Sequence, residues 1–310
     1  MDETSRAGIG GGRTRVERRV RLHQKLLIAP AFLFLAIFLV GPLGLMAWVS
    51  FLERGPHGGI LWGSFTTESY VSFLFERDFD GGLLWNADYA QIFLRSFWLS
   101  LSTTALCLLI SFPTALYMAM LPPRRRTLLV FLVTLPFWSN LLVRNYAWIL
   151  ILRNGGLLDR LLQALGLTSG PLHLLYTDLA VSIGLTYSFL PFMVLPIYTS
   201  LEKLDFRLVE AAYDLGAGPW QALRRVVLPL TAPGLVAGSL LVFVPALGAY
   251  VTPELLGGSK ALMIGNLIQS QFGAARNWPF GAALAFAMLA LVLAAMMAYA
   301  LRFRRNIPGA

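Results

Sequence analysis

Five polar residues lie within or at the edge of long apolar segments, where polar side chains are costly. They come from two of six such segments: Asn140, Arg144 and Asn145 from the third, and Tyr250 and Glu254 from the end of the fifth. A charge inside a membrane-spanning segment usually faces a water-filled cavity or a charged partner. The five side chains are therefore predicted to line a translocation route, in which Arg144 and Glu254 can pair. The alternative is that Arg144 extends to the membrane surface and Glu254 is solvated.

Side chains suited to metal binding or nucleophilic catalysis are scarce. One cysteine, Cys107, excludes a disulfide or a cysteine metal cluster within the chain, and the three histidines are far apart without ligand spacing. No Gly-x-x-x-x-Gly-Lys-Ser/Thr phosphate-binding loop occurs, and none of the three lysines follows a glycine. The chain is therefore predicted to hold no metal or cofactor, to carry no catalytic residues and not to hydrolyse ATP by that route.

The composition is typical of a membrane protein. Of 310 residues, 57% are hydrophobic and only 13% are charged, with a mean hydropathy of +0.66, whereas a soluble domain has roughly 25% charged residues. A helix of about 20 apolar residues crosses the hydrocarbon core of a bilayer. Six stretches are long enough, and they lie near 26–50, 96–121, 128–152, 178–200, 231–253 and 278–301. We therefore predict an all-α membrane protein with six transmembrane helices in one domain over 26–305.

The distribution of Lys and Arg predicts the orientation of the helices. With both termini in the cytoplasm, 17 of the 25 basic residues fall on the cytoplasmic side, in the tail 1–25, at Arg124–Arg126, in the loop 201–229 and after residue 301. This is the expected positive-inside bias. The net charge of +9 is then a signal of topology, with bilayer lipid as its partner, and it leaves no argument for a nucleic-acid partner. The uncharged run Leu26–Leu52 is too long for a cleaved signal peptide, and residues 306–310 form a short second tail.

Two longer segments are predicted on the opposite, outer side. In residues 51–95, the stretch TTESYVSFLFE favours a short helix capped by Thr66 or Thr67. In residues 153–177, leucines on one side predict an amphipathic helix that stops at Gly166. Both helices are expected at the outer membrane surface, either packing in the interface or docking an external partner.

The loop 201–229 predicts two short helices that meet at an angle. Asp205 can cap a helix over 207–215, and Gly216 can end it in the left-handed conformation. Pro219 suits the first turn of the second helix. Trp220, Leu223 and Val226 are expected to hold that helix against the bundle. Pro229 is expected to kink the chain where it enters the fifth span.

This loop resembles the cytoplasmic signature of type I permeases of bacterial ABC importers, E-A-A-x-x-x-G-x9-[IV]-x-L-P. Chance would produce six fixed letters at this spacing about once in 10⁷ windows at average residue frequencies. The loop also falls between the fourth and fifth predicted spans, where the family carries the motif. The matching residues are Glu210, Ala211, Ala212, Gly216, Val226, Leu228 and Pro229, with Val226 in place of the commoner Ile.

The resemblance implies that the loop is a coupling helix, which docks in a cleft of a separate ATP-binding subunit. Ala211 and Ala212 would contact that subunit closely, Glu210 would cap the helix or pair with a basic group, and Gly216 would set the angle of the turn. ATP and Mg²⁺ would then be bound by two copies of the ATPase subunit. Further partners implied are a second, similar permease and a periplasmic solute-binding protein, in the inner membrane of a bacterium.

Two further stretches resemble the polyamine (spermidine/putrescine) branch of these permeases. They are LPFWSNLLVRNYAWILIL at 135–152 and VTPELLGG…MIGNLIQSQF…NWPFGAALA at 251–285. The first subunit of a two-permease pair is the closer likeness, which implies a heterodimer. A related small solute is the other cargo consistent with this branch.

Two other classes of membrane protein are weighed against a permease. A secondary transporter or channel should show an internal repeat and intramembrane ionisable clusters, and neither is visible. An intramembrane enzyme needs converging catalytic groups, yet no predicted span contains histidine.

Overall fold

The computed structural model describes residues 29–73, 75–77, 83–168, 170–258 and 262–304. The predicted tails 1–25 and 306–310 lie outside these residues. The described part is mostly helical, and five of its helices are long and apolar enough to cross a membrane. A sixth crossing results if a bent pair of helices counts as one span.

The five long helices lie close to five of the predicted spans. Helices α4 and α8 are continuous, and the first span contains the π-helix η1 (Ala36–Val40) before α2 (Gly41–Ser50). The helix leading into the fifth span joins α10 (Pro219–Ala222), the π-helix η3 (Leu223–Val227) and α11 (Leu228–Leu247). The long helices are Ala29–Ser50, α4 (Asp88–Met120), α8 (Asp178–Glu202), Pro219–Leu247 and α13 (Trp278–Arg304).

The third span departs from the continuous helix expected over 128–152. Helix α5 (Pro123–Thr134) continues as the 3₁₀ helix η2 (Leu135–Trp138), and α6 (Leu141–Leu152) starts after a break. The chain bends by 91° there. Ser139 and Asn140 are extended, and the Asn140 side chain accepts a hydrogen bond from the Leu142 N–H at 2.8 Å. Asn140 is the N-cap of α6, so a new helix starts there and the preceding one has ended. Hydropathy alone does not reveal such a break.

The segment between the first two long helices contains strands that the sequence did not predict. Strands β1 (Leu52–Arg54) and β2 (Ile60–Phe65) form one antiparallel hairpin, and β3 (Phe75–Arg77) and β4 (Leu83–Trp85) form another. The expected helix shrinks to α3 (Glu68–Val71), and Thr66 accepts the Glu68 N–H at 3.1 Å.

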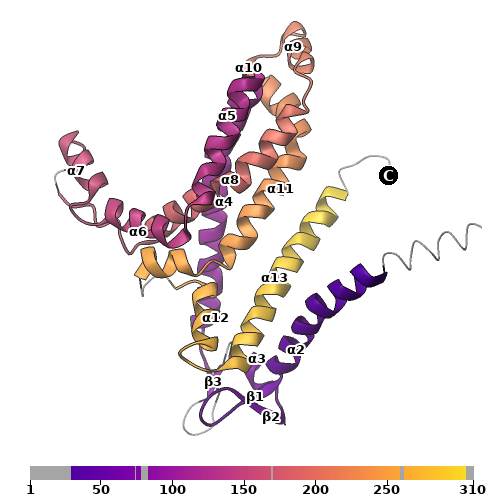
Figure 1. The fold of residues 1–310 in the computed structure, drawn as a ribbon, viewed down its shortest axis with the longest axis vertical. Helices are drawn as coiled ribbons and strands as arrows, with labels where there is room; N and C mark the ends of the chain where they lie inside the picture. The colour runs from indigo at the N-terminus through magenta and orange to yellow at the C-terminus, as the bar shows by residue number, and fades with distance from the viewer. Residues whose placement is uncertain (1–28, 74, 78–82, 169, 259–261, 305–310) are drawn as a thin grey trace, which may run out of the picture.

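The predicted amphipathic helix after the third span is present as α7 (Leu157–Ala164). Gly166 follows it with φ +69°, and the Leu167 N–H reaches back to the Leu162 carbonyl at 3.0 Å. That 6→1 bond with a left-handed glycine is a Schellman ending, as predicted. In Figure 1, α6 and α7 extend sideways from the bundle of long helices.

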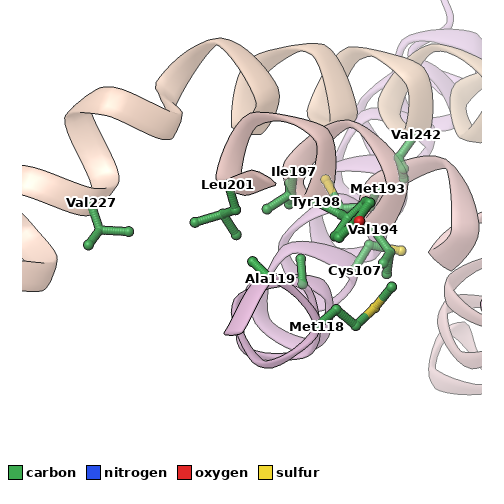
Figure 2. Packing of buried hydrophobic residues seen from close by; sticks show 11 residues of the cluster. Cys107, Met118, Ala119, Met193, Val194, Ile197, Tyr198, Leu201, Val227 and Val242 are labelled. Atoms are coloured by element: carbon green, nitrogen blue, oxygen red, sulfur yellow. The ribbon is translucent and has the colours of Figure 1, made fainter. Parts of the chain in front are cut away.

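Helix α8 packs against both α4 and α11, and these three helices form the centre of the bundle (Figure 1). Helix α13 packs instead on α2 and on α12 (Ile264–Phe272). Figure 2 shows the apolar cluster that joins α4, α8 and α11. Its fully buried members include Cys107 and Met118 from α4, Met193 and Ile197 from α8, and Val242 from α11.

Two glycines allow α11 to approach α8 closely. A Cβ added at Gly234 would lie 2.3 Å from Ser200 Oγ and 2.5 Å from the Pro196 carbonyl oxygen, and one at Gly238 would lie 2.9 Å from Met193 Sδ. Gly234 and Gly238 are four residues apart, which is the small-xxx-small spacing of close helix contacts in membranes. The contact leaves no room for a methyl group at Gly234.

We therefore expect Gly234→Ala to destabilise the helix bundle by about 1–3 kcal/mol, the usual cost of overpacking. Thermal unfolding of the detergent-purified chain measures the effect. Gly44→Ala is the matched control, because a Cβ added at Gly44 in α2 meets no atom within 4 Å. Equal melting temperatures for the two variants would contradict the tight contact.

Candidate functional site

The loop between α8 and α10, residues 203–218, contains one short helix and is called here the α9 loop. Helix α9 (Arg207–Asp214) begins after Asp205, whose Oδ1 accepts the Arg207 N–H at 3.0 Å. Gly216 follows with φ +82°, and the Ala217 N–H bonds to the Ala212 carbonyl at 2.9 Å. This local geometry agrees with the predicted cap and left-handed stop.

The seven residues of the sequence motif are divided between two helices. Glu210 and Ala211 are exposed on α9, and Ala212 is half-buried there. Val226 and Leu228 are half-buried and Pro229 is exposed, in the helix that continues from η3 into α11. The turn at Gly216 thus places the two halves of the motif on consecutive helices.

The expectation for Trp220 is wrong, and the kink expected at Pro229 stays a prediction. The helix runs without a break from Pro219 to Leu247, with Pro229 near the start of α11 and the π-helix η3 directly before it. The wider turn of a π-helix accommodates the missing N–H of a proline. Trp220 is 70% exposed and does not hold the helix to the bundle. Leu223 packs against the buried cluster, and Val226 is half-buried.

The α9 end of the bundle exposes large apolar side chains. Leu215 is 89% exposed, and Leu208 and Tyr213 on α9 and Trp220 on α10 are also exposed. These residues lie at the far end of the molecule from the hairpins (Figure 1). Sequence reasoning left Leu208, Tyr213 and Leu215 unassigned and placed Trp220 against the bundle, because helices this short do not show by their periodicity which apolar side chains face outward.

The polar residues predicted to line a route divide between α6 and the segment after α11. Asn140 caps α6, and Asn145 is 1% exposed, donating its side-chain N–H to the Leu141 carbonyl at 2.9 Å. Arg144 is half-buried, and its Nε is buried without a hydrogen-bond partner. An unpaired buried guanidinium N–H is costly, so Arg144 is the member of the group whose position most needs an explanation.

Tyr250 and Glu254 do not lie on the fifth span, which ends at Leu247. Both are exposed, in a separate turn and π-helix, η4 (Pro253–Gly257), which packs against α6. The Tyr250 carbonyl accepts the Asn266 side-chain N–H at 2.8 Å. Within the described part of the chain, Arg144 and Glu254 form no ion pair, so the structure brings their helices together without joining the charges.

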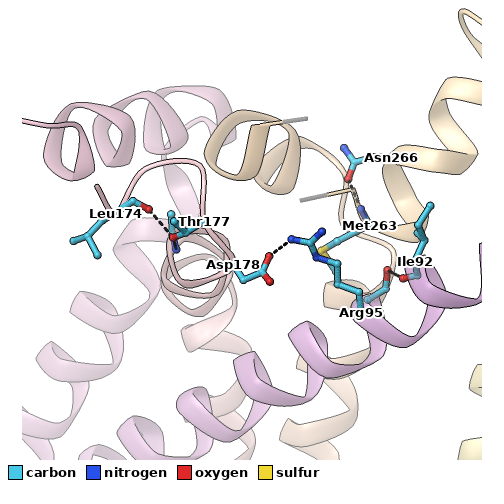
Figure 3. Close-up of polar contacts among 9 residues, drawn as sticks. Ile92, Arg95, Leu174, Thr177, Asp178, Met263 and Asn266 are labelled. Carbon is cyan, nitrogen blue, oxygen red and sulfur yellow. Dashed lines mark hydrogen bonds and ion pairs between the residues drawn. The ribbon is translucent and has the colours of Figure 1, made fainter. Parts of the chain in front are cut away.

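Sequence reasoning missed a polar network at the hairpin end of α4 and α8. Figure 3 shows Arg95 of α4 paired with Asp178, the first residue of α8. The neighbouring Ser96 Oγ donates to the Ile92 carbonyl at 2.7 Å and accepts the Ile264 N–H at 2.8 Å. The network fixes α8 and α12 to α4. An arginine at the edge of a predicted span was the available signal.

Among the described residues, no group of three or more His, Cys, Asp or Glu side chains could hold a metal ion.

Three comparisons with known proteins agree with this architecture. Residues 111–307 match the family of binding-protein-dependent transport system inner membrane components. The chain belongs to this family. It is 43% identical over 276 residues to the spermidine/putrescine transport system permease protein PotB of Haemophilus influenzae, covering 89% of this chain and 92% of that protein. It is likewise 43% identical over 242 residues to PotB of Escherichia coli K12, covering 77% of this chain and 88% of that protein.

Solved structures show the same fold at low sequence identity. A bacterial alginate ABC transporter, solved in complex with an alginate pentasaccharide-bound periplasmic protein, aligns with a TM-score of 0.63 at 18% identity. The alignment covers 96% of this chain and 99% of the other. The family match and the PotB relatives show that this chain is a multi-pass transport permease of the bacterial inner membrane rather than an enzyme. The predicted class of type I ABC importer permease is confirmed.

Proposed function

We propose that this permease imports polyamines such as spermidine and putrescine. The observation that carries the proposal is 43% identity, over most of both chains, to permeases named for spermidine/putrescine transport. A more distant relative, at 29% identity, is a molybdenum transport permease of Azotobacter vinelandii. Cargo therefore differs at lower identity, and the higher identity favours the polyamine assignment.

We infer that the α9 loop docks on a separate ATPase subunit, which binds ATP and Mg²⁺. Exposed apolar side chains beside charged ones suit a protein interface, whose centre is enriched in aromatic residues. Leu215 in the α9 loop and Trp220 on α10 are exposed near charged residues of the loop, outside the uncharged parts of the spans. Glu210, Ala211 and Ala212 lie on the same helix, where small side chains permit close approach. Two ATPase copies would serve a pair of permeases.

The pair would consist of this chain and a second, similar permease, with a periplasmic binding protein delivering the cargo. The hairpins and α3 gather at the end opposite the α9 loop (Figure 1), which we assign to the periplasmic side. The α9 loop then faces the cytoplasm, and both termini do as well. This orientation agrees with the excess of Lys and Arg in the loops at the α9 end.

Reconstitution tests the cargo and the energy source together. Liposomes containing this chain, a second permease and the ATPase of the same system should take up radiolabelled spermidine only with ATP and the binding protein. Omission of the ATPase should reduce uptake to background, since the chain has no phosphate-binding loop. Uptake by the purified chain alone, or uptake of molybdate in place of spermidine, would contradict the proposal.

Docking is tested by adding bulk at an exposed position of α9. We expect Ala211→Trp to weaken ATPase binding at least about tenfold, or 1.4 kcal/mol, because a docked helix has no room for the indole. The dissociation constant of the solubilised complex is the measurement. Ala211 is exposed, so the change should leave folding intact. Ala164→Trp, at an exposed position of α7, is the control, and equal affinity for both variants would contradict docking.

We also propose that α6 and η4 line the route of the solute, with Arg144, Asn145, Tyr250 and Glu254 near it and Asn140 holding the start of α6. The packing of α6 on η4 and the unpartnered Arg144 Nε support this assignment. Glu254, which is exposed, would attract a cationic solute, and Arg144 would oppose its backward passage.

Loss of the two charges is therefore expected to affect different kinetic parameters. We expect Glu254→Ala to raise the KM for spermidine uptake severalfold, because an attractive charge is lost, and Arg144→Ala to change the maximal rate instead. Uptake kinetics in the reconstituted system measure both, with complex assembly checked by co-purification. Normal kinetics in both variants would remove these residues from the route.

A further inference from the structure

One arginine at the α9 end of the bundle contacts three segments at once. Arg126 lies in the first turn of α5, and its Nη1 donates to Glu202 Oε1 at 3.0 Å. Its Nη2 donates to the Ala119 carbonyl at 3.0 Å and to the Leu121 carbonyl at 3.4 Å. Arg126 thus joins the end of α4 to the end of α8.

The chemistry of this contact requires a guanidinium. The last carbonyls of a helix have no partner within the helix, and a positive charge there is favoured by the helix dipole. A planar guanidinium can bond those carbonyls and a carboxylate together, whereas an ammonium acts as a single point charge. The Arg126 side chain is 24% exposed, so the contact is partly shielded from water.

Glu202 is the last residue of α8, and α9 begins only five residues later at Arg207. Apolar residues strengthen the same connection. Phe206 and Val209, at the start of α9, pack against the buried cluster that contains Ala119 of α4 and Leu201 of α8. A displacement of α9 is therefore transmitted over a short distance to the residues that Arg126 holds.

The opposite end of α8 is attached to α4 as well. Asp178, its first residue, pairs with Arg95 (Figure 3). The acids at the two ends of α8 thus bind arginines that hold it to α4 directly or through α5. Arg124 and Arg125, beside Arg126, are exposed and provide controls that carry the same charge.

We propose that Arg126 is a positioning residue for energy coupling: it ties the base of the α9 loop to α4, so that a pull on the loop moves α4 and α8 together. The proposal rests on the proposed docking of an ATPase at this loop. Without the tie, nucleotide-driven motion of α9 is absorbed in residues 203–206 and only part of it reaches the spans.

The test measures solute imported per ATP hydrolysed in proteoliposomes. Arg126→Gln and Glu202→Gln should each lower this ratio about five- to tenfold while ATPase association stays normal. The double variant should be no worse than Arg126→Gln, because residues in one contact are non-additive. Arg124→Gln and Arg125→Gln should match the unaltered protein. An unchanged ratio in Arg126→Gln, or fully additive losses, would overturn the proposal.

Amide hydrogen exchange of the purified chain tests the tie without any transport. Exchange in residues 203–217 should be severalfold faster in Arg126→Gln and in Glu202→Gln than in Arg124→Gln. Glu202→Gln retains the bonds to α4, so it remains informative if Arg126→Gln does not accumulate. Unchanged exchange in both variants would refute the tie. If exchange is faster in the variants but the unaltered protein shows no ATP-dependent uptake, the tie stands and only the proposed function is refuted.

Discussion

The packing of α8 between α4 and α11 is the contact on which the rest of the structure depends. Apolar burial gives little drive for association between helices inside lipid, so van der Waals contact and polar bonds must hold them. Here, contact is gained by the absence of side chains at Gly234 and Gly238 and by the sulfur-rich cluster around Met118 and Met193. The ion pairs Arg95–Asp178 and Arg126–Glu202 lie at the two ends of α8. The α9 loop and the segment after α11 take their positions from these three helices.

The two ends of the helix bundle differ in the side chains that they present and in how they are held. At one end, a short helix between Asp205 and Gly216 presents apolar residues outside the bundle. At the other, α8 and α12 are held to α4 by side-chain bonds. Such a division suits the proposed function, in which the α9 end would receive force and the opposite end would receive cargo. The spans need no catalytic group of their own.

Hydropathy predicted five spans well because each contains a long uncharged run. Turn chemistry predicted the α9 loop because glycine tolerates the positive φ found at Gly216 and proline fixes φ at Pro219. The break at Ser139 and Asn140 was not predictable from hydropathy, since the flanking residues are uniformly apolar. The hairpins were missed because strands of three to six residues are too short for periodicity. Trp220 was misplaced because the sequence does not show which side of a four-residue helix faces the bundle.

The length of α4 has a consequence for where a partner could dock. Its uncharged part begins at Ser96, and the preceding residues Asp88–Arg95 continue the same helix for about 12 Å at 1.5 Å per residue. The hairpins precede α4 in the chain and therefore lie beyond its uncharged part. In the proposed function, a solute-binding protein docked on the hairpins would be separated from the uncharged part of α4 by about two helical turns.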